Sequence, residues 1–397
     1  GAKAVVRDVG RVLGMSFNDV DQIAKLIPAE LKITLDTAID RVPELQQMSK
    51  SRGDEGKLIE YARKLEGMAR HASVHACAVI IAPSDLTDYV PLYRAAKDGT
   101  VTTQFVGETC MDVGLLKMDF LGLKELSLMD EAERLIRIEE PDFVLDEVAW
   151  DDRPTFELFG RGETIGVFQF ESGGMREYLS KLKPDTLEDI IAMNALYRPG
   201  PMENIPSFIA RKQDKEEVRY PHPKLESILE PTYGIMVYQE QVMRIAQVLA
   251  GFSMGQADIL RKAMGKKKPE EMAKVKKDFV GGCVEYGVDK KLAEDLFADI
   301  EIFAGYAFNK SHAACYSEVA YKNAYLKANY PREYMSASLT MDRNNTERLT
   351  ILLDDCRRMD IPVLPPDVNQ STLNFTPTEE GIRYGLSAIK TVGEGAA

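Results

Sequence analysis

Two charged side chains, Lys117 and Asp119, project from an otherwise apolar segment at residues 114–122. Side chains alternate between the two faces of a β-strand, so this lysine and this carboxylate share one face while leucine, methionine and phenylalanine line the other. Charges near a buried sheet are costly unless they are paired, solvated or bound to a metal. The pair therefore suggests a site. The alternative is that Asp119 caps the following helix or pairs with Lys117.

A second candidate group is the strongly basic stretch at residues 261–277, which carries eight lysine and arginine side chains against two glutamates. An arginine fork and several lysine point charges suit a polyphosphate, because all of them donate hydrogen bonds to phosphate oxygens. A solvated charge run is the alternative interpretation. The candidate phosphate and DNA ligands of this stretch are Arg261, Lys262, Lys266, Lys267, Lys268 and Lys274.

A third group interleaves aromatic and polar residues at positions 303–312 and includes Lys310 and His312. Such a polar tip suits a nucleotide base, sugar or phosphate, whereas a buried structural histidine is the alternative for His312. Tyr321 and Tyr325, one helical turn apart, favour a core position or stacking within their helix. Arg198 stands just before Pro199-Gly200-Pro201, where it either meets the nucleotide or anchors a helix end to a neighbouring acid.

Together, a carboxylate for magnesium and dispersed cations for a triphosphate are what nucleotidyl transfer requires. Two metal ions need two or three bridging acidic ligands, and Asp119 is one. Asp112, seven residues earlier, falls on the opposite strand face or in the preceding turn. The partner carboxylates are thus missing from the pattern.

The elements that position these residues follow from hydrophobic periodicity, which changes twice along the chain. It is helical from residue 4 to about residue 70 and alternates with a period of two from residue 75 to residue 121. It is mainly helical again after residue 123, with a strand-like segment at residues 166–170 and a small αβ piece at residues 349–397. We expect an α+β fold that is predominantly helical. Strands are predicted at residues 75–83, 100–106 and 114–121 in a small antiparallel sheet, with a hairpin turn at Asp98-Gly99.

Composition sets outer limits on the class of protein. With 397 residues, 45% hydrophobic and 28% charged, the chain is long enough for two to four folded units and unlike a disordered chain. Its longest apolar run, residues 76–82, falls far short of the roughly 20 residues of a membrane span, so we expect a cytosolic protein. Five cysteines without a C-x-x-C pair argue against both a disulfide framework and a zinc site.

A net charge of −13 would repel nucleic acid, which leaves the local basic stretch to attract it. The first residue is not methionine and the last residues stop abruptly, so we expect a piece of a larger protein.

Several blocks of the sequence resemble those of the bacterial replicative DNA polymerase III alpha subunits, the C family of DNA polymerases. The resemblance extends over essentially the whole chain, and its blocks are long enough to be specific. They lie at residues 4–11, 75–76, 116–123, 166–172, 196–201, 238–241, 260–269 and 305–312.

The resemblance implies a domain order of helical thumb (residues 1–73), second part of a nucleotidyltransferase-like palm (74–125) and helical fingers (126–345). A small αβ continuation of the fingers (346–397) would stop before a helix-hairpin-helix region. Asp119 matches the third metal-binding aspartate of the family, and Lys117 matches a lysine directed at the incoming triphosphate. Arg261 and Lys262 match a basic pair of the fingers, and Lys310 and His312 fall in a further block near the nucleotide. Arg198 and Lys266 are weaker nucleotide ligands, while Lys267, Lys268 and Lys274 are candidates for DNA contact.

The implied reaction is template-directed transfer of a deoxynucleotide to a primer 3′-hydroxyl with two Mg²⁺ ions, in the bacterial cytoplasm at the nucleoid. Implied partners are primer-template DNA, the incoming dNTP and, mostly through other regions, a sliding clamp, a proofreading exonuclease subunit and a clamp-loader subunit. One departure matters most: the Pro-Asp-x-Asp-x-Asp pattern that carries the first two catalytic aspartates does not occur here. We therefore expect this chain alone to be inactive. The alternatives are a non-catalytic DNA-binding module, in which the lysines track the backbone, and a replisome scaffold that docks partner subunits.

Overall fold

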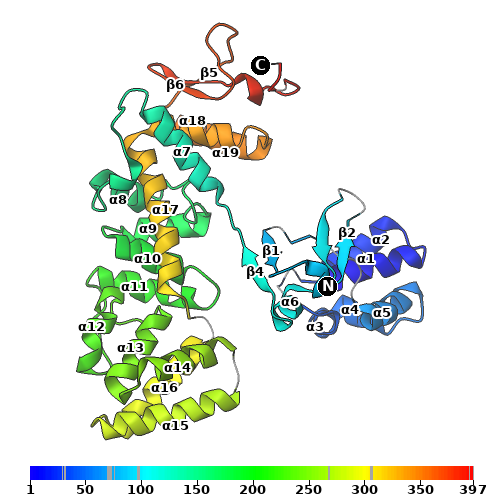
Figure 1. Ribbon diagram of the computed structural model, residues 1–397, viewed down its shortest axis with the longest axis vertical. Coiled ribbons are helices and arrows are strands. Elements are labelled where there is room, and N and C mark those ends of the chain that lie inside the picture. The colour runs from blue at the N-terminus through cyan, green and yellow to red at the C-terminus, as the bar shows by residue number, and fades with distance from the viewer. Residues whose placement is uncertain are drawn as a thin grey trace. The chain divides into compact units, whose positions relative to one another are not determined.

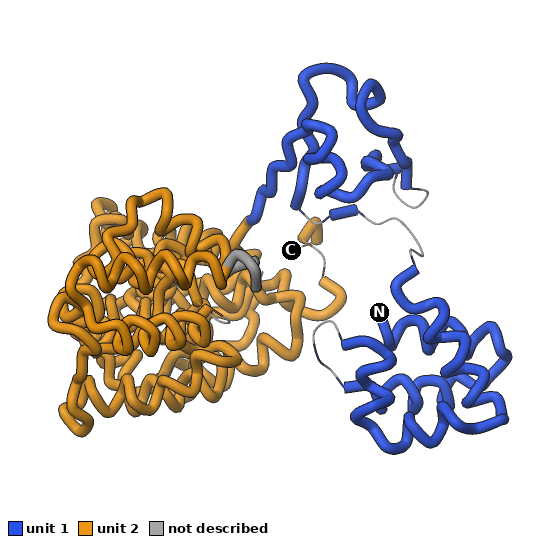
Figure 2. The backbone as a smooth tube through the Cα atoms, turned by 90° about the horizontal axis from the view of Figure 1, so that it is seen from below, with its two compact units in different colours: residues 1–121 blue, residues 122–397 orange. Residues whose placement is uncertain are grey.

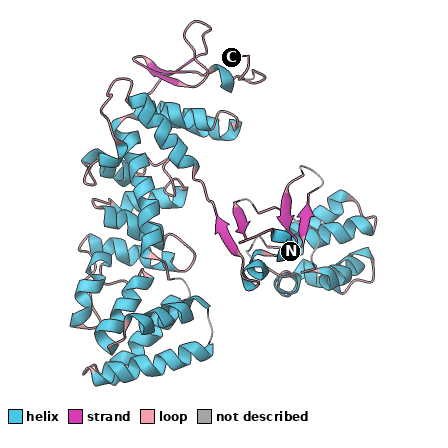
Figure 3. Cartoon of the chain, in the orientation of Figure 1, coloured by secondary structure: helices cyan, strands magenta, loops and turns pink. Residues whose placement is uncertain are grey.

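The chain forms two compact units, residues 1–121 and 122–397, each described here by itself (Figure 2). The computed structural model describes residues 1–28, 30, 33–68, 74–75, 77–95, 99–266, 269–304, 307–392 and 394–396; at 265, 266 and 269–271 it describes the backbone alone. Helices dominate both units, and the strands are short (Figure 3). The prediction of a predominantly helical α+β fold is confirmed.

The first unit opens with five helices that share one apolar core. Val6, Ile27, Leu35 and Leu58 lie fully buried in this core. The Ser16 side chain accepts a hydrogen bond from the Asp19 amide at 3.1 Å, which fixes the start of the second helix. These helices are α1 (Ala2–Val12), α2 (Phe17–Leu26), α3 (Leu35–Arg41), α4 (Pro43–Ser49) and α5 (Asp54–Leu65).

Two antiparallel ribbons follow within the same unit, where we expected a single small sheet. One pairs β1 (Ala78–Ile81) with β4 (Leu116–Asp119), and the other pairs β2 (Leu92–Arg94) with β3 (Val101–Thr103). The three predicted strands are present but shorter, and β2, which is too short to show alternation, was missed. The short helix α6 (Gly107–Asp112) leads into β4. Asp98 of the predicted hairpin turn lies outside the described residues.

The apolar side of β4 is open to solvent in the described structure, which corrects the expectation of a buried face. Leu116, Met118 and Phe120 are 53%, 41% and 65% exposed. The reason is the small size of the ribbon, because three fully buried residues, Cys110 among them, make up the core cluster of this region. The charged face and the apolar face of β4 are therefore both accessible.

The second unit consists mainly of helices, with a small sheet near the C-terminus. The helices are α7 (Lys124–Ile136), α8 (Arg153–Arg161), α9 (Gly173–Leu182), α10 (Leu187–Leu196), α11 (Ile205–Lys212), α12 (Glu226–Leu229), α13 (Gln239–Ala250), α14 (Met254–Lys266), α15 (Pro269–Glu285), α16 (Lys290–Ala304), α17 (Lys310–Asn329), α18 (Pro331–Met341) and α19 (Thr346–Arg358). Single 3₁₀ turns are η1 (Leu86–Asp88) in the first unit and η2 (Leu145–Glu147), η3 (Pro201–Asn204), η4 (Pro223–Leu225), η5 (Glu230–Thr232) and η6 (Leu386–Ala388) in the second. Among the described residues no helix is long and apolar enough to cross a membrane.

Helix α17 is the central element of this unit and packs against α7, α8, α10 and α18 (Figure 1). It begins at Lys310, where the Asn309 side chain caps it by accepting a hydrogen bond from the His312 amide at 2.8 Å. Tyr321 is fully buried, and its hydroxyl donates to the Ala149 carbonyl at 2.8 Å. The core interpretation of Tyr321 is thereby confirmed.

The segment at residues 166–170 differs from its sequence-based prediction, and the C-terminal segment agrees with its own. Residues 166–170 form turns and not a strand, since Gly166 and Gln169 both have positive φ, 83° and 63°. The alternation that suggested a strand comes from Val167 and Phe170, which the turns bury. Near the C-terminus, β5 (Val363–Leu364), β6 (Thr376–Thr378) and β7 (Gly381–Arg383) form a sheet of order β5–β7–β6 that packs against α18, in agreement with the expected αβ piece.

Candidate nucleotidyl-transfer site

Lys117 and Asp119 share one face of β4, as predicted, and they contact each other directly. Lys117 Nζ lies 2.7 Å from each of the two Asp119 carboxylate oxygens. The antiparallel register places Ile80 opposite Lys117 and Ala78 opposite Asp119. The side chain of Asp119 is 42% exposed, so its oxygens remain accessible from solvent. The Asp119 carboxylate is therefore accessible on β4, with the ammonium group of Lys117 at both of its oxygens.

Helix α6 and the turn after it fix the position of β4. Gly114 adopts φ of 89° and donates to the Met111 carbonyl at 3.0 Å, while the Leu115 amide donates to Cys110 at 3.0 Å. This left-handed turn reverses the chain from helix to strand, and glycine adopts it without strain. At the other end of α6, a Cβ on Gly107 would stand 2.9 Å from Lys117 Cδ. The stem of Lys117 therefore crosses the start of α6 where no side chain obstructs it.

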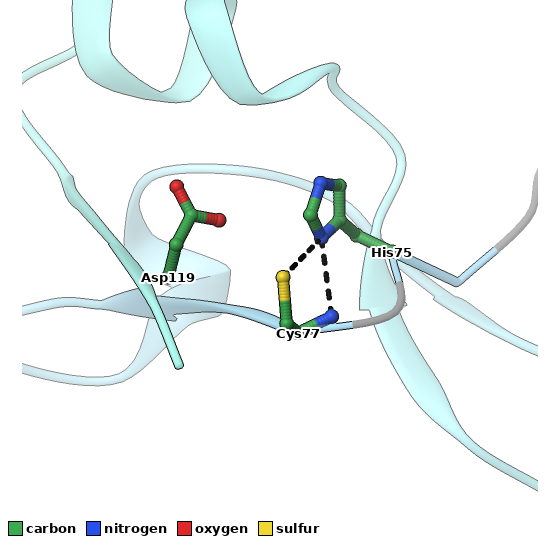
Figure 4. A group of neighbouring side chains, drawn as sticks. All are labelled: His75, Cys77 and Asp119. Carbon is green, nitrogen blue, oxygen red and sulfur yellow. Dashed lines mark hydrogen bonds between the residues drawn. The ribbon is translucent and has the colours of Figure 1, made fainter. Parts of the chain in front are cut away.

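Two further side chains surround the Asp119 carboxylate, His75 and Cys77 (Figure 4). The ligand atoms of His75, Cys77 and Asp119 all lie within 4.8 Å of one another. The Phe120 amide donates to the Cys77 carbonyl at 2.9 Å and extends the β1–β4 ladder to this point. Within the described ranges, this trio is the one group of three or more histidine, cysteine and acidic side chains close enough to hold a metal ion.

The basic pair of α14 is held by an acidic residue of the same helix. Arg261 Nε and Nη2 donate to Asp258 Oδ1 at 2.9 and 2.8 Å, and Lys262 Nζ lies 2.8 Å from Asp258 Oδ2. Hydrogen bonds from Lys262 and then from Arg261 lower the pKa of Asp258. Both cations are thus oriented by a carboxylate three or four residues before them.

The remaining members of the basic stretch are described unevenly. Lys266 ends α14, but its side chain lies outside the described atoms, as do Lys267 and Lys268 entirely. Lys274 is exposed on α15. Their predicted contacts with phosphate or DNA remain predictions.

A small cavity of about 220 Å³ gathers two of the predicted nucleotide ligands, Arg198 and His312. The Arg198 guanidinium lies 3.9 Å from the centre of the Phe308 ring, and that ring contacts His312 edge to face at 5.3 Å. The His312 ring in turn stacks on Tyr316 at 4.1 Å. Gln169, whose φ is 63°, also lines this cavity, and strained backbone of this kind clusters at functional sites.

Arg198 also closes the end of α10. Its Nε and Nη2 atoms donate to the Ala195 carbonyl at 3.0 and 2.9 Å. Burial lowers the pKa of Arg198. Arg198 therefore binds the backbone at the end of its own helix.

Lys310 lies at the start of α17, two residues before His312. Its ammonium group stands 3.1 Å from Glu188 and 5.4 Å from the centre of the Tyr238 ring. Its backbone amide donates to Glu240 at 2.9 Å. The structure thus brings Arg198, Lys310 and His312 to one region of the second unit, while Arg261 and Lys262 lie on α14 of the same unit and Asp119 belongs to the first unit.

No role was predicted from the sequence for three residues of these clusters, His75, Cys77 and Asp258, whereas Phe308 belongs to the predicted group at residues 303–312. Asp258 was within reach of prediction, because its spacing to Arg261 and Lys262 is that of facing residues on a helix. His75 and Cys77 could only be found by knowing that β1 pairs with β4, and no short-range signal carries that pairing.

Comparison with known protein families gives the class of protein. Residues 1–122 match the model of the bacterial DNA polymerase III alpha NTPase domain, and residues 125–287 match that of the bacterial DNA polymerase III alpha subunit finger domain. Residues 360–397 match a helix-hairpin-helix motif, within the range 346–397 that we assigned to a continuation of the fingers. The first two models describe domains of the bacterial DNA polymerase III alpha subunit.

Individual relatives agree with this class along almost the whole chain. The DNA polymerase III subunit alpha of Borreliella burgdorferi is 49% identical over 391 residues, which cover 98% of this chain and 34% of the relative. The subunits of Pseudomonas aeruginosa and Escherichia coli K12 are 47% and 46% identical, each over 99% of this chain and 35% of the relative. The chain belongs to the family of bacterial DNA polymerase III alpha subunits and spans about a third of the length of these relatives.

Proposed function

We propose that this chain supplies the thumb, part of the palm and the fingers of a DNA-directed DNA polymerase. In the proposed reaction a primer 3′-hydroxyl attacks the α-phosphate of an incoming dNTP and pyrophosphate leaves. Family membership supports the class of reaction, and one observation carries the assignment of the site. Asp119 presents a solvent-accessible carboxylate with a cation at both of its oxygens, within the family-like block at residues 116–123.

Asp119 would hold Mg²⁺ together with carboxylates from outside this chain. Its donor set fits the ion, because Mg²⁺ prefers hard anionic oxygens and keeps several water ligands. A bound Mg²⁺ would supply charge neutralisation to the reacting phosphates and acidify the attacking hydroxyl. A single carboxylate does not make a two-metal site, so the isolated chain should not extend a primer.

Lys117 would serve the triphosphate. In the described arrangement its ammonium group neutralises Asp119 at 2.7 Å. Once Asp119 ligates a cation, Lys117 loses its partner and becomes available to phosphate oxygens. Placed two residues from the ligand on the same strand face, it would neutralise charge on the pyrophosphate as that group leaves.

Unit 2 would supply the remaining cations. Arg261 and Lys262 would contact the triphosphate, with Lys266 and Lys310 as further point charges. His312 and Arg198 line an aromatic cavity whose stacked rings suit the planar parts of a nucleotide. Primer-template DNA and the dNTP are the proposed substrates, and Lys267, Lys268 and Lys274 would meet the DNA backbone.

The decisive experiment is primer extension by a longer polypeptide that restores the region preceding this chain in its relatives. We expect the parent to extend a primer with Mg²⁺ and dNTPs and Asp119→Asn to lower the rate at least about 100-fold, because a metal ligand acts on the transition state. Binding of primer-template should remain within about twofold, since Asp119 is not a DNA ligand in this proposal.

Asp112→Asn provides the matched control, because Asp112 is an exposed aspartate at the end of α6 in the same unit. It should leave extension unchanged. Normal extension by Asp119→Asn would make Asp119 a structural ion pair and overturn the assignment. Robust, Asp119-dependent extension by the isolated chain would contradict the proposal that ligands are missing.

A further inference from the structure

We infer that His75, Cys77 and Asp119 form a binding site for a thiophilic divalent cation such as Zn²⁺ or Co²⁺. The three side chains offer one nitrogen, one sulfur and one oxygen ligand, all within 4.8 Å of one another (Figure 4). Zinc sites with three protein ligands keep a fourth position for water. A site of this composition differs from the magnesium site proposed above, which uses oxygen ligands alone.

The distance between the first two ligands already suits a tetrahedral ion. Cys77 Sγ lies 3.6 Å from His75 Nδ1. Ligand bonds of about 2.3 Å to sulfur and about 2.0 Å to nitrogen, at a tetrahedral angle, require a separation of about 3.5 Å. From the 4.8 Å limit the Asp119 carboxylate needs to approach by about 1.3 Å at most to reach a similar separation, which is a shift that a change of side-chain rotamer can supply.

The backbone holds the trio in place before any ion binds. The β1–β4 register sets Ala78 opposite Asp119, and the Phe120 amide donates to the Cys77 carbonyl at 2.9 Å. His75 Nδ1 accepts hydrogen bonds from the amides of Ala78 at 3.0 Å and Cys77 at 3.3 Å. In a neutral imidazole this leaves the proton on the other ring nitrogen, so the Nδ1 lone pair faces the thiol.

Metal binding replaces existing contacts of the three side chains with metal–ligand bonds, and each proton, lone pair and charge is accounted for. The S–H bond of Cys77 breaks, its proton passes to solvent and a sulfur–metal bond forms. The Nδ1 lone pair leaves the two backbone amides for the ion. Lys117 leaves the Asp119 oxygens, from which it stands 2.7 Å, because the ion takes over the neutralisation of that carboxylate.

Ligand chemistry decides which ions this site prefers. A thiolate and an imidazole favour Zn²⁺ and Co²⁺ over Mg²⁺, which demands oxygen ligands in an octahedron. The absence of a C-x-x-C pair argues against a structural zinc site with several thiolates, and this site needs only one. Asp119 lies on β4, whereas His75 and Cys77 lie in the segment just before β1, so the ligands are distant in sequence and cysteine spacing did not indicate them.

The test requires neither DNA nor nucleotide, so its outcome is separate from that of the proposed function. The purified chain is titrated with Co²⁺, and the thiolate-to-cobalt charge-transfer band and the visible bands of tetrahedral Co²⁺ are recorded. Zn²⁺ is then added to displace Co²⁺, with Mg²⁺ as a parallel competitor. The variants are Cys77→Ser, His75→Gln and Asp119→Asn, and the matched control is Cys315→Ser, which removes an exposed cysteine of α17.

We expect one equivalent of Co²⁺ with a thiolate band in the parent and in Cys315→Ser, displaced by Zn²⁺ but not by millimolar Mg²⁺. Cys77→Ser should lose the band and bind Zn²⁺ at least about 100-fold more weakly, and the other two variants should also weaken binding. Circular dichroism checks that each variant is folded, with Cys77→Ala as a second substitution. The inference is overturned if the parent shows no band, if the band survives in folded Cys77→Ser or Cys77→Ala, or if it disappears in Cys315→Ser.

One consequence links this site to the proposed function and rests on it. The same Asp119 oxygens would serve Zn²⁺ here and Mg²⁺ during nucleotide transfer. In the longer polypeptide, micromolar Zn²⁺ should therefore inhibit primer extension, and Cys77→Ser should relieve that inhibition when each rate is compared with the rate of the same protein in Mg²⁺ alone. Relief without a Co²⁺ thiolate band in the parent chain would contradict the inference and leave the polymerase assignment intact.

Discussion

Arg261 is oriented by Asp258 on its own helix, at 2.8 Å, which presents its guanidinium in a fixed direction. If it meets the triphosphate, Arg261→Ala in the longer polypeptide should lower the extension rate by about 100-fold, because it removes a cation that acts on the transition state. The affinity for primer-template DNA should change much less. Single-turnover extension and DNA binding by anisotropy measure the two quantities.

Arg244 gives the matched control for that experiment. It is an exposed arginine on α13 of the same unit, and its side chain donates to Gln247. Arg244→Ala should leave the extension rate near that of the parent. A change confined to duplex affinity in Arg261→Ala would remove it from the triphosphate site.

The cysteines differ in reactivity for reasons of burial. Burial raises the pKa of Cys283 to about 11 and that of Cys356 to about 12, so both remain thiols at pH 8. Cys315 is exposed. Iodoacetamide should therefore label Cys315 in minutes and leave Cys283 and Cys356 unlabelled in the folded chain, because the thiolate is the nucleophile. Peptide mass mapping checks this, with urea-unfolded protein as the control in which all cysteines react.

At this scale, alternation along one strand was enough to predict that Lys117 and Asp119 face the same way. It could not place His75 and Cys77 beside them, because that depends on which other strand is the neighbour. The pairing of β1 with β4 closes a long loop and leaves no mark on the sequence around either strand.

At the scale of elements, one buried ion pair ties α17 to α19. Lys327 Nζ lies 2.6 Å from Asp355, and it donates to the carbonyls of Glu163 at 2.9 Å and Ile165 at 2.7 Å. Both side chains are buried, at 1% and 6% exposure. Lys327→Met should lower the free energy of unfolding by about 3–5 kcal/mol, since it leaves Asp355 buried without a counter-charge. Urea denaturation followed by circular dichroism measures the loss.

Two further variants test whether the expected loss of stability comes from the unpaired buried charge. The double variant Lys327→Met/Asp355→Leu should recover most of the stability, because no buried charge remains. Lys181→Met, which breaks a fully exposed pair with Glu177 on α9, should have little effect. Equal stability of Lys327→Met and the parent would show that the buried pair is not structural.

Element boundaries followed from the sequence wherever capping residues marked them. A capping box of Thr186 and Asp189 starts α10, and Ser253 and Gln256 exchange hydrogen bonds before α14. The polar group predicted at residues 303–312 includes the first turn of α17, which begins at Lys310. The turn at residues 166–170 imitated a strand by burying alternate residues.

At the scale of the whole molecule, the charge is −13, yet residues 261–277 are locally basic. If the lysines of this stretch track DNA, binding of primer-template should weaken steeply between 50 and 200 mM salt. Replacing Lys266, Lys267, Lys268 and Lys274 with glutamine should reduce the slope of log affinity against log salt by about 3–4. Fluorescence anisotropy of the purified chain over a salt series gives this slope.

The control replaces four lysines of the same unit that lie outside the basic stretch, Lys181, Lys183, Lys215 and Lys224, with glutamine. The total charge changes equally, so an effect specific to the first variant identifies the location of the contacts. An unchanged slope in both variants would favour the scaffold alternative over a DNA contact at this stretch.

The order of helical and strand-rich regions was predictable at this scale because the hydrophobic period changes visibly near residues 75 and 123. The division into two ribbons was not, since strands of three or four residues carry little periodicity. The family resemblance added the assignment of the blocks, and the matched family models at residues 1–122 and 125–287 agree with it.

Asp258, which is paired with both Arg261 and Lys262, also affects which anions could bind these two cations. Any anion that approaches these cations competes with a carboxylate already within 2.8 Å of each. Chloride carries one charge and gains little by displacing it, whereas a polyphosphate offers several charged oxygens at once. If Arg261 and Lys262 bind the triphosphate, this competition would favour polyphosphates over simple monovalent anions.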